Sequence, residues 1–431
     1  MSPCCSSDWL QYRNPIGRTI FYRASVSTNI LSEGIGFYDK SRSDIKSAAF
    51  SSDIRVTELD GVRGMAILFV LLWHYVGIPL SPAGIHLNPD QWIPSIKLSM
   101  ILLRSGVDLF FVLSGFLITG ILIDHRASRI YYRPFFARRI CRIFPLYYVL
   151  FLIFAGARFA GVRGPFFDGP IPLMSYATMT QNYFMAGYGT YGAIWLGATW
   201  SLAIEEQFYL LFPFVVRHSR RSLPWLFVVG IVGAPALRIW CYHHFGNDDF
   251  AAYTWLPCRL DSLCWGAIVA CTLRTSIGVN FLQRYRSALA VVFVVLLAGA
   301  VILDAALARD IGYHMSIWGH TLLAILYASF IVLVVLNAGR DITRLFRWRP
   351  LCDLGRISYG VYLTHGIILA FVFAAFSRPA VLDGVVGSSL VLAAFILTLV
   401  IASVSYRYFE KPIIKLGHRI DYDKGVLQPL S

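Results

Sequence analysis

Long apolar runs, repeated along most of the chain, are the feature that most constrains the fold. Lipid offers no partner for unpaired backbone N–H and C=O groups, so an apolar run of about 17 to 25 residues is expected to cross a bilayer as a helix. Ten such runs predict an all-α, polytopic membrane protein, a bundle of about ten transmembrane helices. The runs cover about residues 62 to 79, 101 to 123, 143 to 160, 199 to 216, 224 to 243, 257 to 273, 288 to 307, 316 to 337, 356 to 376 and 385 to 406.

Positive charge gathers in the loops on one side of the predicted bundle. The formal net charge is +14, which in a soluble protein would suggest a nucleic-acid partner. If the N-terminus is cytoplasmic, the inner loops and the C-terminal tail carry 22 Lys and Arg residues and the outer loops carry five. Because Lys and Arg favour the cytoplasmic side, the sequence predicts both termini in the cytoplasm, the lipid bilayer as partner and no nucleic acid.

The two ends of the chain are predicted to lie outside the bundle. Residues 1–54 are polar and rich in serine, without an apolar segment that suits a signal peptide or a span, so they are expected to form a flexible cytoplasmic tail. Residues 55–416 form the predicted transmembrane domain and residues 417–431 a short cytoplasmic tail. No soluble catalytic domain is expected after the last run, so the chemistry is assigned to the bundle.

The cysteine and histidine residues suggest neither disulfides nor a metal site. The chain has eight cysteines, of which Cys141, Cys241, Cys264 and Cys271 fall in or beside apolar runs. No pairing pattern and no metal-ligand spacing emerges, so we expect reduced, structural cysteines and no metal.

The first apolar run contains two ionisable residues, Arg63 and His74, in the stretch GVRGMAILFVLLWHY. Eleven residues make just over three helical turns, so both side chains are predicted on nearly the same face, about 16 Å apart along the axis. An ionisable group at the centre of a membrane helix costs about 2.5 to 3.5 kcal/mol on insertion scales, and such groups usually face the interior of the bundle. Alternatively, Arg63 anchors the inner flank and His74 is a hydrogen-bonded packing residue.

Ionisable residues of four runs are predicted at a similar depth in the outer half of the membrane. They are His74, Asp108, the neighbours Glu205 and Glu206, and the pair Arg259 and Asp261. A histidine near carboxylates suits a general base, because the carboxylate orients the ring and stabilises its protonated form. The same charges could instead satisfy one another as a structural network or relay protons in a transporter.

The predicted inner side is rich in arginine, in the stretch RPFFARRICRIFPLYY. Arg139 and Arg142 are three residues apart and share a helical face, where guanidinium groups suit phosphate oxygens. This pair therefore predicts a site for a phosphorylated donor from the cytoplasm. For Arg133 and Arg138 the preference of positive charge for the inner side is sufficient explanation.

Hydroxyl groups beside glycines mark further candidate positions. Ser114 precedes Gly115, and Ser358 and Tyr359 precede Gly360. Such combinations allow close helix approach and offer hydroxyl groups for hydrogen bonding. His365 is expected nearer the inner half of the ninth run, where it suits either packing or substrate contact. The candidates for contact with the acceptor substrate are Ser114, Arg259, Asp261, Tyr359 and His365.

Seven motifs follow one another as in the acyltransferase-three family of membrane O-acyltransferases, which the chain resembles over about residues 56 to 416. They are ELDGVRGMAILFVLLWHY, GVDLFFVLSGFLIT, FARRICRIFP, TWSLAIEEQFYLLFP, RLDSLCWGAIVA, LGRISYGVYLTHG and RYFEKP. The family's R-x10-H motif, associated with catalysis, falls on Arg63 and His74. Its R-x-x-R-I-x-P motif, associated with the acyl donor, includes Arg139 and Arg142.

The resemblance implies an enzyme of a bacterial inner membrane that moves an acyl group, usually acetyl, from acyl-coenzyme A to a hydroxyl group of a glycan or related acceptor. His74 would be the general base, with Glu205 or Asp108 orienting its ring, and a covalent acyl-histidine remains open. The glutamate of the family's W-S-L motif falls on Glu205 or Glu206. Many relatives carry a C-terminal esterase-like domain, and the chain resembles the stand-alone members.

Two other functions compete with acyl transfer. A secondary transporter or a flippase of a glycan-related substrate would also use buried charges, but it more often shows repeated halves, and no repeat relates the first five runs to the last five. A polysaccharide polymerase or ligase typically has its critical arginines in a large outer loop. The predicted outer loop 161–198 contains only Arg163.

Overall fold

The structure is a computed structural model that describes residues 9–13, 19–23, 56–78, 102–245, 250–306, 314–382 and 384–422. The chain divides into two units, Met1–Ala48 and Ala49–Ser431. In the first unit, strands β1 (Trp9–Arg13) and β2 (Thr19–Arg23) form an antiparallel pair in which Trp9 lies opposite Arg23. Most of the tail predicted over residues 1–54 and the end of the predicted tail 417–431 lie outside the described residues, and both tails stay predictions.

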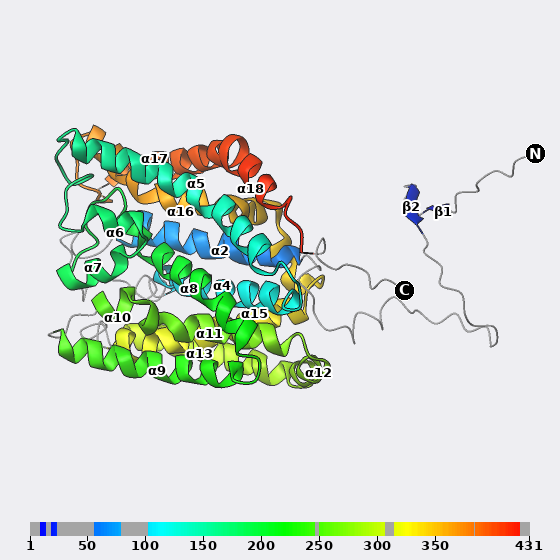
Figure 1. Ribbon diagram of the computed structural model, residues 1–431. Helices are drawn as coiled ribbons and strands as arrows, with labels where there is room; N and C mark the ends of the chain where they lie inside the picture. Colours follow the sequence, from blue (N-terminus) through cyan, green and yellow to red (C-terminus); the bar gives the residue numbers. More distant parts are fainter. Residues whose placement is uncertain are drawn as a thin grey trace, which may run out of the picture. The chain divides into compact units, whose positions relative to one another are not determined.

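The described part of the second unit is built of helices (Figure 1), and the described residues of each predicted apolar run fall mainly on helical elements. The longer elements are α2 (Thr57–Leu72), α4 (Gly106–Asp124), α5 (Tyr132–Phe159), α8 (Trp200–His218), α9 (Leu223–His244), α11 (Leu256–Thr272), α13 (Arg286–Ala306), α15 (His320–Leu336), α16 (Arg349–Ala375) and α17 (Gly384–Ser405). The shorter ones are η2 (Trp73–Gly77), α6 (Leu173–Ala177), α7 (Gln181–Tyr188), η4 (Gly197–Thr199), α10 (Phe250–Thr254), α12 (Ser276–Arg284), η5 (Met315–Gly319), η6 (Asp341–Arg347), η7 (Tyr406–Glu410) and α18 (Lys411–Gly417).

Seven helices of the described part are long and apolar enough to cross a membrane, or eight if a bent pair counts as one span. The pair joins Phe250–Thr272 to Ser276–Arg284 at an angle of 103°. The predicted all-α, multi-pass membrane bundle is confirmed, whereas the count of ten spans is not. Of the other predicted spans, α8 carries two carboxylates in its middle and α13 has a shorter apolar stretch, Arg286–Ile302.

Glycines bring helices of the second unit into backbone contact. Helix α4 packs on α11, and α2 packs on α16 (Figure 1). A methyl group added at Gly115 of α4 would overlap the backbone carbonyl of Leu263 in α11, and one added at Gly64 of α2 would overlap that of Leu351 in α16. Small residues are what allow membrane helices to approach this closely. The two contacts fix the relative positions of the ionisable residues that these four helices carry.

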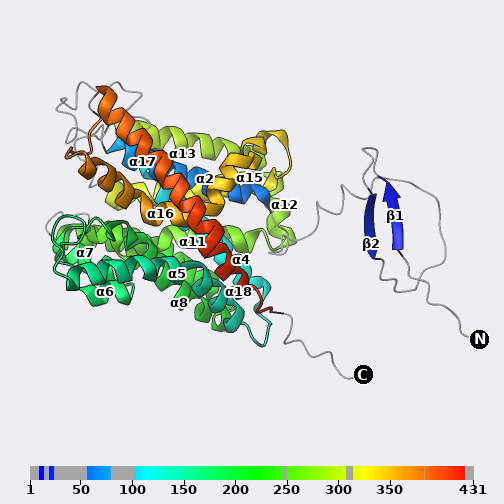
Figure 2. The same cartoon turned by 90° about the horizontal axis from the view of Figure 1, so that it is seen from above.

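The segment between α5 and α8, predicted as a long outer loop, is folded against both helices (Figure 2). The indole of Trp195 donates a hydrogen bond of 2.9 Å to the carbonyl of Leu150 in α5, and the Gln207 amide of α8 donates to Asn182 in α7, also at 2.9 Å. At the start of the segment, the backbone N–H of Gly164 donates to Asp168 and lowers the pKa of that carboxyl group. Hydrogen bonds therefore connect this segment to both α5 and α8.

Candidate functional site

Side chains of five helices, α2, α4, α5, α8 and α16, line a cavity of about 120 Å³. It brings together half of the twelve residues that the sequence marks as candidates. These are Arg63, Ser114, Arg139, Arg142, Glu205 and Tyr359. The other six, which do not line it, are His74, Asp108, Glu206, Arg259, Asp261 and His365.

Arg139 and Arg142 share a face of α5, as their spacing predicts, and both line the cavity. Within the described part of the chain, neither guanidinium group has a hydrogen bond or an ion pair. The guanidinium group of Arg139 lies over the ring of Tyr209, 5.6 Å from its centroid, and its Nε is buried without a partner among the described residues. Because guanidinium groups present several donors in a fixed fork, the pair leaves unfilled hydrogen-bond donors beside the cavity.

A third guanidinium group, that of Arg63, reaches the same cavity from α2. Its Nη1 lies 3.4 Å from a carboxylate oxygen of Asp60, one turn earlier, and the side chain is 28% exposed. Three arginines and one glutamate, Glu205, are the charged residues of the lining. The balance of charge around the cavity is positive, which favours an anionic ligand.

The structure distinguishes the neighbouring carboxylates Glu205 and Glu206, which the sequence leaves equivalent. Glu205 lines the cavity and accepts a hydrogen bond of 2.9 Å from the hydroxyl group of Tyr209. That hydroxyl lies 2.6 Å from Oγ of Ser114 on α4. Glu206 does not line the cavity, and its Oε1 is buried with no hydrogen-bond partner in the described ranges. Glu205 is therefore the carboxylate that a ligand in the cavity would contact.

His74 lies in a π-helical turn, η2, that ends the first membrane helix. Its Nδ1 is 2.8 Å from the carbonyl oxygen of Val70, and the side chain is half-buried. The ring lies edge-on to that of His365, with centroids 4.6 Å apart. This contact puts at one level two residues that the sequence analysis expects at different depths, and the expected depth of His365 stays a prediction. Helix α16 begins at Arg349, before the predicted start of the run, so His365 lies beyond the midpoint of the helix.

Asp108 makes no hydrogen bond to His74 in the described structure. The sequence analysis names Asp108 or Glu205 as the carboxylate that orients the His74 ring. Its Oδ1 accepts an ion-paired hydrogen bond from Arg259 of α11 and lies 3.0 Å from Nδ1 of His320 at the start of α15. The close contact of α4 with α11 at Gly115 places Asp108 beside Arg259. The imidazole partner of Asp108 is therefore His320, a residue that the sequence analysis did not single out.

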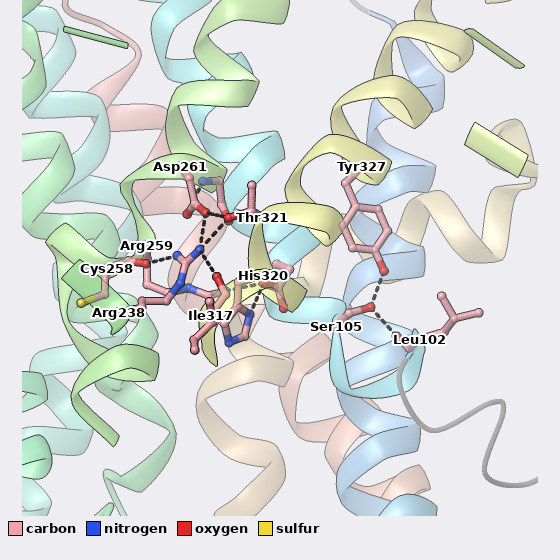
Figure 3. Close-up of polar contacts among 12 residues, drawn as sticks. Leu102, Ser105, Arg238, Cys258, Arg259, Asp261, Ile317, His320, Thr321 and Tyr327 are labelled. Atoms are coloured by element: carbon pink, nitrogen blue, oxygen red, sulfur yellow. Dashed lines mark hydrogen bonds and ion pairs between the residues drawn. The ribbon is translucent and has the colours of Figure 1, made fainter. Parts of the chain in front are cut away.

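Asp261 belongs to the same buried region as Arg259 (Figure 3). It accepts hydrogen bonds from Arg238 of α9, at 2.9 Å, and from the hydroxyl group of Thr321, at 2.7 Å. The side chains of Arg238 and Asp261 are fully buried. The single layer of charges expected in the outer half is in fact divided. Asp108, Arg259, Asp261, Arg238 and His320 are joined by ion pairs and hydrogen bonds, although Nε of Arg238 and both Nε and Nη1 of Arg259 have no partner among the described residues. Glu205 and the arginines Arg139 and Arg142 of α5 line the cavity instead.

Three residues with hydroxyl groups line the cavity but escaped the sequence analysis: Ser201, Tyr209 and Tyr362. Tyr209 follows Glu205 by four positions, so the helical face they share was a readable signal. The sequence around Tyr362 has no such signal, because the hydrogen bond between its hydroxyl group and Ser201 of α8 depends on how α16 packs near α8. Within the described ranges no three His, Cys, Asp or Glu side chains form a group that could hold a metal ion.

The chain matches a known protein family and several curated proteins. A family model described as an acyltransferase domain matches residues 56–407. An O-acetyltransferase named OatA from Staphylococcus aureus strain NCTC 8325 is 27% identical over 384 residues, which cover 84% of this chain and 57% of the relative. OatA of strain COL gives the same values. A second protein of strain COL, SACOL0978, is 25% identical over 378 residues, or 83% of this chain and 57% of its own length.

The chain thus spans little more than half the length of the curated relatives it matches. No solved structure matches it significantly.

Proposed function

The chain belongs to the acyltransferase-three family, and on that premise we propose that it is a membrane O-acyltransferase. It moves an acyl group, acetyl in the first instance, from acyl-coenzyme A to a hydroxyl group of a glycan or related acceptor. The observation that carries this proposal is the cavity with three guanidinium groups and one carboxylate. The names of the relatives support O-acetyl transfer, and the same proposal assigns the protein to a bacterial inner membrane.

Binding of the acyl donor, acyl-coenzyme A, is assigned to Arg139 and Arg142. Both have free donors at the cavity, and paired N–H groups of arginine suit the phosphate oxygens of coenzyme A. Arg63 adds a third positive charge. With the predicted orientation, these residues face the side from which cytoplasmic acyl-coenzyme A arrives.

The general base is assigned to His74. A carbonyl oxygen only accepts hydrogen bonds, so the contact with Val70 requires a hydrogen on Nδ1 and leaves the lone pair of the neutral ring on Nε2. Nε2 then takes the proton of the acceptor hydroxyl group as its oxygen attacks the thioester carbonyl carbon. The carbon–sulfur bond breaks, and the leaving thiolate receives the proton from the imidazolium. An acyl-histidine route would use the same lone pair.

Tyr362 lies between the cavity and the histidines. It lines the cavity, its hydroxyl group donates a hydrogen bond of 2.9 Å to the carbonyl of Ala198, and its ring centroid is 5.7 Å from that of His365. In the proposed reaction the thioester passes Tyr362 to reach His74. Glu205 and Tyr209 line the same cavity as Tyr362.

Membrane vesicles that contain the protein and its natural glycan, incubated with acetyl-coenzyme A labelled in the acetyl group, test the proposal directly. We expect label in the glycan, removed by mild base as an ester. A transporter or flippase would leave the glycan unlabelled while moving its substrate across the membrane. Vesicles without the protein provide the control, and unlabelled glycan in active, acceptor-containing vesicles would contradict the proposal.

A further inference from the structure

Two cysteine side chains meet where α9 and α11 pack together. The sulfur atoms of Cys241 in α9 and Cys258 in α11 are 3.9 Å apart, and both residues are fully buried. Among the six cysteines that the structure describes, all of them free thiols, these are the two whose sulfur atoms are in contact. The residues are 17 positions apart in the chain. Helix packing, and not local sequence, therefore brings the two thiols together.

Hydrogen bonds between the two helices support this contact. The guanidinium group of Arg238, one turn before Cys241, donates a hydrogen bond to the backbone carbonyl of Cys258 (Figure 3). The same group donates to the carboxylate of Asp261 in α11 at 2.9 Å. The side chains of Arg238 and Asp261 are fully buried. The two thiols thus lie at a junction at which α9 and α11 are joined through both backbone and side-chain groups.

Both cysteines lie near helix ends that the charge pattern predicts on the outer side. Cys241 is in the last turn of α9, which ends at His244, and Cys258 is in the first turn of α11, which begins at Leu256. With the N-terminus in the cytoplasm, as predicted, the fifth apolar run leaves the membrane and the sixth enters it on the outer side. The compartment outside a bacterial inner membrane favours disulfides, whereas the cytoplasm keeps thiols reduced.

We propose that Cys241 and Cys258 form a modification site, joined in the mature protein by a disulfide bond that links the end of α9 to the start of α11. The sequence analysis expects reduced cysteines because no spacing pattern pairs them, and the contact between the two sulfur atoms is the reason to depart from that expectation. Formation of the bond brings these atoms from 3.9 Å to about 2.05 Å. The proposal depends on the predicted orientation and not on the proposed acyl transfer.

The oxidant is a protein disulfide of the outer compartment, of the class that exchanges its own disulfide for two thiols. The thiolate of one cysteine attacks this disulfide and displaces one sulfur atom of the oxidant. The thiolate of the other cysteine then attacks the mixed disulfide and displaces the second. The chain loses two electrons and two protons, and the oxidant leaves as the dithiol that carries them. Because both cysteines are buried in the folded chain, the exchange takes place before α9 and α11 have packed.

Trapping of thiols tests the proposal. Cells are quenched in acid, and the denatured protein is alkylated with N-ethylmaleimide, reduced, and alkylated again with iodoacetamide. Trypsin together with a protease that cleaves before aspartate separates the two cysteines, on the peptides IWCYHHFGN and DFAAYTWLPCR. We expect both peptides to carry the iodoacetamide label, which marks sulfur atoms that were oxidised in the cell. In a sample that is not reduced, the same two peptides should be found joined.

Cys264 and Cys271 are the matched controls, because they lie on the same helix and have no sulfur contact among the described residues. Both fall on the peptide DSLCWGAIVACTLR and should carry N-ethylmaleimide. In the variant Cys241→Ala, Cys258 loses its partner and should also change to the N-ethylmaleimide label.

The proposal is wrong if Cys241 and Cys258 carry N-ethylmaleimide in the wild-type protein, or if Cys258 stays oxidised in Cys241→Ala. Neither readout requires acyl transfer, so the test separates a failure of the disulfide from a failure of the proposed function.

Discussion

The hydroxyl group of Tyr209 donates a hydrogen bond of 2.9 Å to Glu205, one turn earlier in α8, at the wall of the cavity. This bond fixes one oxygen of the carboxylate and leaves the other for the cavity. Tyr209→Phe removes the bond, which to a charged group contributes about 1.5–3 kcal/mol. We therefore expect the rate of labelled acetyl transfer to fall about tenfold or more. Tyr148→Phe, which loses a bond of 2.9 Å to the carbonyl of Ala177 away from the cavity, should transfer normally.

Substitutions of the two adjacent glutamates should differ sharply in their effect on the rate of acetyl transfer. Glu205→Gln changes the only carboxylate of the cavity lining in the described structure, so we expect a loss of at least tenfold in transfer rate. Glu206→Gln alters a side chain that does not line the cavity and should leave most of the activity. The comparison requires equal amounts of inserted protein, measured by immunoblot of the membranes. Equal loss in both variants would contradict the assignment to Glu205.

His74→Ala should abolish transfer while the protein remains inserted. General-base catalysis contributes about 10²- to 10⁴-fold, so we expect a loss in this range. His125→Ala is the comparison, because His125 also contacts a carbonyl of its own helix, that of Ile121 at 3.0 Å, and does not line the cavity. Acetylation that persists at the wild-type rate in His74→Ala would exclude His74 from the mechanism.

Arg139→Ala and Arg142→Ala should raise the KM for acetyl-coenzyme A. Each removes donors assigned to phosphate, and a hydrogen bond to a charged group contributes about 1.5–3 kcal/mol, so we expect an increase of about tenfold or more. Arg133→Ala is the matched control on the same helix, since Arg133 is exposed and does not line the cavity. If the dependence of the rate on donor concentration is unaltered in both variants, these arginines serve only the orientation of the protein in the membrane.

The buried pair of Arg238 and Asp261 should matter for stability. Asp261→Asn leaves the guanidinium group uncompensated in the interior, which costs about 3–5 kcal/mol. The double variant Arg238→Met/Asp261→Leu removes both charges and should be less destabilised than the single one. Thermal unfolding in detergent measures the difference. Asp353→Asn breaks a half-exposed pair with Arg356 and should shift the midpoint little; a comparable shift in this control would argue against a special role for the buried pair.

The all-helical membrane architecture could be predicted from the sequence because apolar length is a local property that lipid translates directly into helices. The same is true of Arg139 and Arg142, whose shared face depends only on the pitch of α5. The ion pair of Asp108 with Arg259, in contrast, joins residues 151 positions apart. It depends on the depth to which α4 and α11 approach one another, which periodicity within either helix does not determine.

The position of His365 illustrates a second limit. Its level relative to His74 depends on where α16 begins. The helix begins before the apolar run, and the run misses this first part because several of its residues are polar. A hydropathy plot detects the apolar part of a helix but does not locate the residue at which the helix begins. The π-helical turn at His74 has no signal of this kind either, since the residues Trp73–Gly77 suit an ordinary helix equally well.

The glycine contacts have a consequence for the route of the substrates. Main-chain contacts join α4 to α11 and α2 to α16, and Gly106 brings α4 against the backbone of Ala66 in α2, so these four helices form one linked group that cannot separate without losing its packing. Substrates therefore have to enter beside this group, and the movements that admit them are those of side chains or of the helices packed around it.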